Sequence, residues 1–153
     1  MLLVKTQSTL LINSEIDLSV IENLILEKEI VLASHAIYED LGSDWTNNQH
    51  IANTKIIGGS PTNSKKGSCI QVSYGNIQPT IMGFTVSNGL GTSMIVDDCG
   101  ISRTERSGGA IMAFQAYPIL SYNRFIGNGA PALSTDNALL ATQNGGAITL
   151  YDD

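Results

Sequence analysis

Acidic side chains in the second half of this 153-residue chain are spaced so that they could support two kinds of chemistry. Asp97 and Asp98 are adjacent, and Asp136 follows in a later polar segment. Because Ca²⁺ takes six or more oxygen ligands, Asp97 and Asp98 could supply part of a calcium site. Glycoside hydrolysis needs two carboxyl groups roughly 5–9 Å apart, which Asp98 and Asp136 would provide if their segments lay side by side. Solvated surface carboxylates would give the same pattern.

Four further residues are candidates for contacting a ligand directly. Trp45, Tyr117 and Tyr122 have amphipathic rings that could stack on sugars, and Arg124 could add a polar contact. Tyr117 and Tyr122 also flank an expected strand, so packing at its two corners is the alternative role.

Histidine and cysteine offer little recognisable chemistry. His35 and His50 bracket a polar segment, and without an evident acidic or thiol partner we expect them to be solvated and to bind no metal. Cys69 and Cys99 are either two small buried thiols or a disulfide between neighbouring layers. No nucleophile elbow, phosphate-binding loop or dinucleotide fingerprint is present.

The composition excludes several classes of protein. Charged residues make up 14% of the chain, below the usual ~25%, which argues against a coiled coil. The net charge is −6 and the eight basic residues are scattered, so we expect no nucleic-acid partner. No run of 18 apolar residues occurs, so we expect no membrane span. The first residues do not match a secretory signal peptide.

The chain repeats itself at intervals near forty residues. One short segment recurs as Gly67–Ile70, Gly108–Ile111 and Gly145–Ile148, at offsets of 41 and 37 residues. A second segment recurs as Pro79–Gly89 and Pro118–Gly129, at an offset of 39 residues, with a fainter copy at Asn53–Gly59. Each unit has β-branched strand residues and Gly or Asn at its corners.

A two-strand unit of this kind cannot bury its apolar face alone, but it can do so against copies of itself. The sequence therefore predicts an all-β fold, a right-handed parallel β-helix (solenoid) of about four coils in a single domain over 1–153. Three inward ladders are predicted: Ile70 with Ile111 and Ile148, Ile81 with Leu120, and Val86 with Phe125. Asn123 and Asn128 are expected to bond turn backbones, and the paired glycines at 108–109 and 145–146 to lie at crowded corners.

The N-terminal third allows two interpretations. It forms strands at Thr9–Ile12, Glu22–Lys28 and Glu29–Ser34, or Ser14–Glu29 forms an amphipathic helix capped by Ser14. Variable loops are predicted at 35–51, 60–66, 90–107 and 130–144. The last three leave the same corner of the unit, so we expect them to lie side by side along one edge.

The Gly-Gly-Ala-Ile tetrapeptides at 108 and 145, with Phe125–Asn128, carry a resemblance to known repeats. The chain resembles the right-handed parallel β-helix repeat family, which is pectate-lyase-like, and its repeats are similar to those of polymorphic outer-membrane autotransporter adhesins. Only one FxxN motif occurs, and Val86 stands where the previous unit would have its Phe. The resemblance implies an extracellular or cell-surface location.

Two functions follow from this resemblance. The first is a secreted or cell-surface module that binds a polysaccharide or a surface protein through its stacked loops. The second is a polysaccharide lyase or glycoside hydrolase acting on an acidic polysaccharide. In lyases of this fold, carboxylates hold Ca²⁺ and an Arg or Lys removes a sugar proton. The candidate catalytic residues are then Asp98, Arg103, Arg106 and Asp136, and Ca²⁺ is the only cofactor implied.

The repeat also bears on self-association. Asp153 comes only five residues after Ile148, and the end coils of a solenoid expose unpaired strand edges. We therefore expect the chain to be a piece of a longer solenoid or to associate end to end with another copy.

Overall fold

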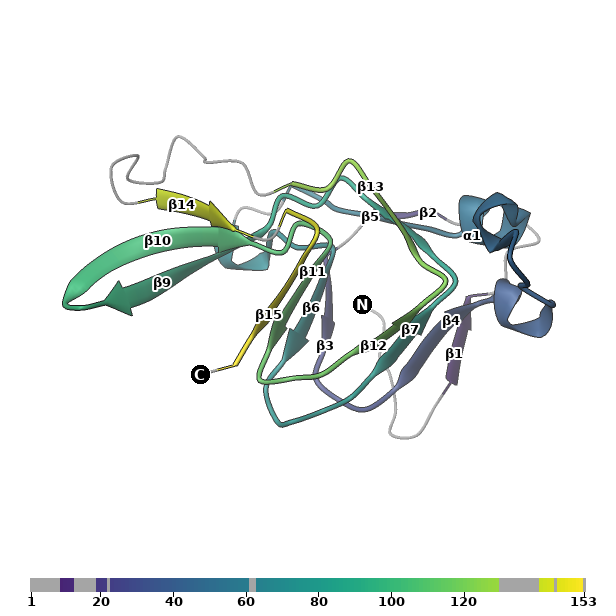
Figure 1. Cartoon of the computed structure of the whole chain (residues 1–153), viewed down its shortest axis with the longest axis horizontal. Coiled ribbons are helices and arrows are strands. Elements are labelled where there is room, and N and C mark those ends of the chain that lie inside the picture. The colour runs from purple at the N-terminus through teal and green to yellow at the C-terminus, as the bar shows by residue number, and fades with distance from the viewer. Residues whose placement is uncertain are drawn as a thin grey trace.

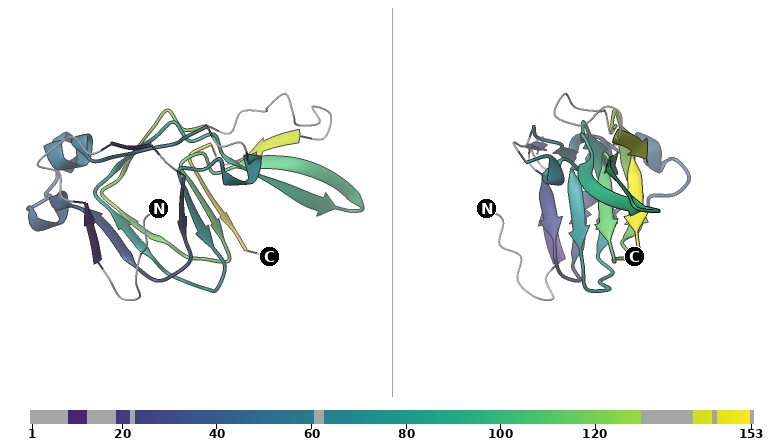
Figure 2. Two further views of the ribbon diagram at one scale, coloured as in Figure 1. Left: turned by 180° about the vertical axis from the view of Figure 1, so that it is seen from behind. Right: turned by 90° about the vertical axis from the view of Figure 1, so that its left-hand side faces the viewer.

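The computed structural model describes residues 9–12, 19–21, 23–60, 63–129, 141–144 and 146–152. These residues form an all-β fold in which three parallel sheets lie on three sides of one apolar core (Figure 1). In Figure 2 the strands of one sheet follow one another from the N-terminal to the C-terminal side. No helix in the described part of the chain is both long and apolar enough to cross a membrane.

Each of the three sheets has four strands. The first is β1 (Thr9–Ile12), β4 (Val31–Ser34), β7 (Thr80–Met82) and β12 (Ile119–Ser121). The second is β2 (Ser19–Ile21), β5 (Lys55–Ile57), β8 (Thr85–Ser87) and β13 (Arg124–Ile126). The third is β3 (Leu24–Leu26), β6 (Ile70–Ser73), β11 (Ile111–Phe114) and β15 (Ile148–Tyr151).

The register of these sheets confirms the residue pairing of the predicted ladders, although Ile148, on the edge strand β15, is exposed rather than buried. Ile111 pairs with Ile70 on one side and with Ile148 on the other. Leu120 pairs with Ile81, and Phe125 with Val86. The sequence repeat is therefore a repeat of strand pairing, in which equivalent residues occupy neighbouring strands.

The ladders build the core. The fully buried side chains include Leu32, Ile56, Ile70, Val72, Ile81, Phe84, Val86 and Ile111. Burying one such side chain stabilises the fold by about 1.5–3 kcal/mol relative to leaving it exposed. The apolar positions of the repeat are thus the main favourable contribution to folding.

Two asparagines bond the backbone of turns, as the sequence predicted, and they also tie neighbouring units together, which it did not predict. The Asn123 amide donates to the Ile81 carbonyl at 2.7 Å and accepts from the Phe84 N–H at 3.0 Å. The Asn128 amide donates to the Val86 carbonyl at 2.8 Å and accepts from the Gly89 N–H at 3.0 Å. Both asparagines satisfy the turn one repeat earlier rather than their own.

Two predictions about the N-terminal third are decided by the structure. The alternative helix over Ser14–Glu29 is wrong, because this stretch contains β2 and β3. The predicted loop at 35–51 is only partly irregular, since it holds two short 3₁₀ helices, η1 (His35–Tyr38) and η2 (Trp45–Asn47), and the start of α1 (Gln49–Asn53). Ser34 and Asn48 cap η1 and α1 with their side-chain oxygens.

The segment predicted as a loop at 90–107 is instead a β-hairpin. Strands β9 (Thr92–Asp98) and β10 (Ile101–Ser107) pair antiparallel around a turn at Cys99 and Gly100, both at positive φ. Strand β14 (Ala141–Asn144) continues this sheet by pairing parallel with β10. Nothing repeats in this hairpin, so the forty-residue pattern did not reveal its strands.

Candidate ligand-binding groove

The variable segments gather at one edge of the molecule. A short 3₁₀ helix, η3 (Ser64–Lys66), packs beside β9, and β14 pairs with β10 on the other side of the hairpin. Figure 1 shows the hairpin projecting from the corner where the second and third sheets meet. The described parts of the three segments expected to be loops, which include η3, the hairpin and β14, therefore lie side by side.

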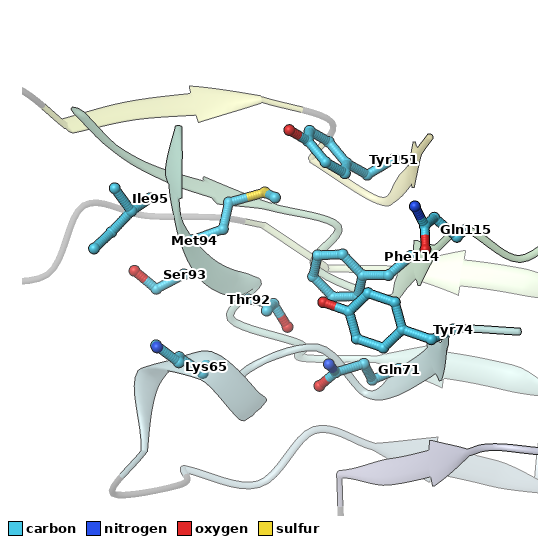
Figure 3. Close-up of a pocket in the computed structure, with 10 residues that line it drawn as sticks. All are labelled: Lys65, Gln71, Tyr74, Thr92, Ser93, Met94, Ile95, Phe114, Gln115 and Tyr151. Carbon is cyan, nitrogen blue, oxygen red and sulfur yellow. The ribbon is translucent and has the colours of Figure 1, made fainter. Parts of the chain in front are cut away.

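A groove of about 440 Å³ lies between this hairpin and the outer face of the third sheet (Figure 3). This volume is in the range of small-molecule sites. The side chains that line the groove come from η3, β6, β9, β11, β15 and the turns after β6 and β11. They are Lys65, Gln71, Tyr74, Thr92, Ser93, Met94, Ile95, Phe114, Gln115 and Tyr151.

Three aromatic rings form one wall of the groove. The rings of Tyr74 and Phe114 are stacked, with centroids 5.7 Å apart and planes at 20°. Tyr151 meets Phe114 edge to face at 6.3 Å. The three rings come from equivalent ends of neighbouring strands, because Phe114 pairs with both Ser73 and Tyr151. The repeat thus places an aromatic row along the groove.

Polar groups face this row. Figure 3 shows Lys65 and Ser93 across the groove from the rings, and Gln71 and Gln115 close to them. Lys65 carries the only charge among the ten lining residues. The groove therefore combines an apolar stacking surface with amide and hydroxyl groups and one cation, and this set favours a neutral or acidic ligand with flat apolar faces.

The four ligand-binding residues predicted from the sequence do not lie in this groove. Trp45 and Tyr122 contact each other edge to face at 5.8 Å, and Trp45 packs on a small apolar cluster beside α1. The Tyr117 hydroxyl donates to Asp152 at 3.0 Å, and this carboxylate raises the pKa of Tyr117. Arg124 is half-buried on β13. The structure brings together only Trp45 and Tyr122.

The candidate catalytic residues are only partly described. Asp97 is exposed and accepts a hydrogen bond from the Ser102 hydroxyl. Arg106 is 2% exposed and donates to the Gly91 carbonyl at 3.1 Å, so its guanidinium supports the base of the hairpin. The side chains of Asp98 and Arg103 lie outside the described part, as does Asp136 altogether.

His35 and His50 do not match the expectation that they lack an acidic partner. Two short helices bring both imidazoles beside Glu39, with ligand atoms of the three side chains within 4.8 Å of one another. The short separation of His35 and Glu39 in the sequence was the available signal. The approach of His50 could not be read from the sequence, because it depends on how η1 packs against α1.

The two cysteines are free thiols in unlike environments, so the predicted alternatives of a disulfide or two buried thiols are both wrong. Cys69 is buried, and its thiol donates to the Ser87 carbonyl at 3.2 Å. Burial raises the pKa of Cys69 to about 11. Cys99 is exposed at the tip of the hairpin.

We expect one thiol per folded chain to react rapidly with Ellman's reagent at pH 8, and the second only after unfolding, because a thiolate is the reactive species. Cys99→Ser should remove the fast reaction and Cys69→Ser should leave it intact. Two fast thiols in the wild type would contradict this assignment.

The pKa of Cys69 is raised from its ordinary value of 9.0 to about 11 in the folded chain. The free energy of unfolding should therefore fall as the pH rises between these two values. Cys69→Ala should lack that loss of stability.

Comparisons with known proteins found no matching family model, no matching curated protein and no matching solved structure.

Proposed function

We propose that this chain is a parallel β-helix module that binds a glycan in the groove beside the hairpin. The β-helix part of the proposal is supported by three parallel sheets whose equivalent strands recur at the same offsets as the sequence repeat. Parallel crossover connections are right-handed in about 98% of cases, which favours the right-handed form. The family resemblance supports a location outside the cell or at its surface.

The aromatic row is the observation that carries the binding proposal. Tyr74 is 62% exposed and its ring lies flat on Phe114, so one face of a stacked pair is presented to solvent. Saccharides have apolar C–H faces edged with hydroxyl groups, and exposed tyrosines suit such ligands because each has an apolar ring and a polar tip. Gln71 and Gln115 line the same groove beside the rings, and their amide groups can donate to and accept from hydroxyl groups.

An acidic saccharide fits better than a cationic ligand. Among the residues that the structure describes, the groove is lined by one lysine, Lys65, and by no carboxylate. A uronate carboxylate could approach this ammonium, and the resulting charge-assisted hydrogen bond is stronger than a neutral one.

Binding measurements on variants of one tyrosine in the groove and one tyrosine outside it test the proposal. Oligogalacturonates and neutral glucan oligomers of equal length are titrated into the protein by calorimetry. Tyr74→Ala should weaken binding roughly tenfold, about 1.4 kcal/mol, and Lys65→Ala should weaken only the acidic series. Tyr38→Ala is the control, because Tyr38 is 65% exposed and does not line the groove.

Three results would contradict the proposal: no oligomer binds, Tyr38→Ala weakens binding as much as Tyr74→Ala, or Tyr122→Ala removes binding while Tyr74→Ala does not. The last result would restore the site predicted from the sequence at Trp45 and Tyr122. The lyase and hydrolase alternative stays a prediction, and new ultraviolet absorbance from an unsaturated uronate during the same titration would favour the lyase.

End-to-end association of two copies also stays a prediction. Among the described strands, β12, β13 and β15 are sheet edges, with exposed Ile119, Ile126 and Leu150 on them. Such edges present unpaired backbone groups and apolar side chains to a partner strand.

A further inference from the structure

Two imidazoles and one carboxylate converge on the side of the molecule opposite the hairpin. His35 opens η1, Glu39 directly follows it, and His50 lies in α1. Figures 1 and 2 show these short helices at the end of the molecule farthest from β9 and β10. The cluster is therefore separate from the proposed glycan groove.

The fold holds the three side chains in place. Ala36 from η1 and Ile51 from α1 are fully buried in one small apolar cluster, which fixes the two helices against each other. The Asn48 side chain accepts from the Ile51 N–H at 3.1 Å and, through its amide nitrogen, donates to Glu39 Oε2. One Glu39 oxygen is thereby oriented, and the other, Oε1, lies 3.1 Å from Nε2 of His50.

These distances suit a small divalent ion. Zinc bonds to nitrogen and oxygen ligands at about 2.0–2.2 Å in a tetrahedron, so neighbouring ligand atoms lie about 3.3–3.5 Å apart. The Nε2–Oε1 pair is already close to this separation, and the widest pair of the three lies within 4.8 Å, so side-chain rotation on binding would have to bring that pair closer.

An unsatisfied nitrogen in the same cluster points to a missing ligand. Nδ1 of His35 is buried and has no hydrogen-bond partner among the described residues. Buried polar atoms without partners are rare, and an ion or a water is a common explanation for one. In a metal-bound imidazole, one nitrogen binds the ion and a hydrogen bond from the other orients the ring. An ion bound in this cluster would therefore make the His35 ring a metal ligand.

We propose that His35, Glu39 and His50 bind one zinc-class divalent ion, with water in the fourth coordination position. Two imidazoles and a carboxylate favour Zn²⁺ and its transition-metal neighbours over Ca²⁺ and Mg²⁺, which prefer all-oxygen sites. The ion would join η1 to α1, and the fourth position would remain open to an incoming ligand.

Calorimetric titration of the untagged, chelator-treated chain with Zn²⁺ tests the site. We expect one ion per chain, and no comparable heat with Ca²⁺. Glu39→Gln and His50→Gln should each weaken Zn²⁺ binding roughly tenfold or more, since each removes a direct ligand. Asp40→Asn is the matched control, because it makes the same charge change one residue away, where Asp40 only accepts from the Gly42 N–H.

A second readout separates a built site from casual surface binding. The chain contains two histidines, so each ring gives an assignable nuclear magnetic resonance signal. Zn²⁺ should shift both rings at the same stoichiometry, in a protein whose circular dichroism is unchanged. The proposal is overturned if only one ring shifts, if Asp40→Asn weakens binding as much as Glu39→Gln, or if folded Glu39→Gln binds Zn²⁺ like the wild type.

Discussion

Replacing Gly89 with alanine is expected to destabilise the fold by about 3–5 kcal/mol, a large part of the 5–15 kcal/mol typical of a domain. A Cβ at Gly89 would overlap the Gly109 carbonyl oxygen, lie 2.5 Å from its carbon and lie 2.8 Å from the Cys69 sulfur. The clash is with backbone of the next repeat, which cannot rotate away as a side-chain end could.

The backbone at Gly89 has no room to shift either. Its N–H donates to Asn128 at 3.0 Å, and its carbonyl accepts from the Gly129 N–H at 3.0 Å. Moving the chain to relieve the overlap would break both bonds. The cost is therefore steric, and it arises because two repeats approach each other here at backbone distance.

Gly146→Ala provides the control for Gly89→Ala. A Cβ at Gly146 meets nothing within 4 Å among the described residues, so the change should alter stability by less than about 1 kcal/mol. Urea unfolding followed by circular dichroism measures both variants. Equal midpoints for Gly89→Ala and wild type would contradict the close approach.

The surroundings of these glycines also correct the prediction that both glycine pairs lie at crowded corners. The crowding holds for Gly108 and Gly109 but not for Gly146.

Asn128→Ala is expected to cost about 2–4 kcal/mol, the second largest effect. The truncation leaves the Val86 carbonyl and the Gly89 N–H without their side-chain partner, and each unsatisfied group in a buried turn costs about 1–3 kcal/mol. The amide is also 3.6 Å from the Cys69 sulfur, so its loss opens space beside a core residue.

Asn47→Ala is the matched asparagine control. Asn47 is exposed and its amide donates only to the exposed Asp44 carboxylate at 2.6 Å, so its removal should cost less than about 1 kcal/mol. Thermal unfolding of both variants and of Asn123→Ala, which should behave like Asn128→Ala, provides the measurement. An Asn128→Ala protein as stable as Asn47→Ala would show that the bonds between repeats contribute little.

The two largest effects thus fall on positions that join one repeat to the next. The sequence analysis identified these positions, because asparagine and glycine recur at the corners of the unit. It did not reveal that the amide of Asn128 reaches the turn 39 positions earlier, or that Gly89 meets Gly109 at backbone distance. Corner residues are visible in a sequence, whereas their partners depend on the register between strands.

The candidate sites could be predicted less well. Tyr74 and Tyr151 were not singled out as ligand-binding residues. Tyr151 shares the repeat position of Phe114, but the equivalent residue in the preceding unit is Ser73, and Tyr74 comes one residue later, so the sequence repeat did not mark an aromatic row. The hairpin that closes the groove was predicted as a loop, because its sequence does not follow the unit. Glu39 was missed because a single acidic residue near a histidine is common in any surface segment.

The sequence by itself determined the all-β class, the parallel pairing of equivalent strands and the identity of the three apolar ladders. These features could be predicted because every repeat places the same residue types in the same surroundings, so the same pattern occurs several times in the chain. Only the tertiary structure decided where the aromatic row meets the hairpin and how His35 and His50 approach Glu39. Those arrangements depend on insertions that occur once, and their packing against one another leaves no periodic trace in the chain.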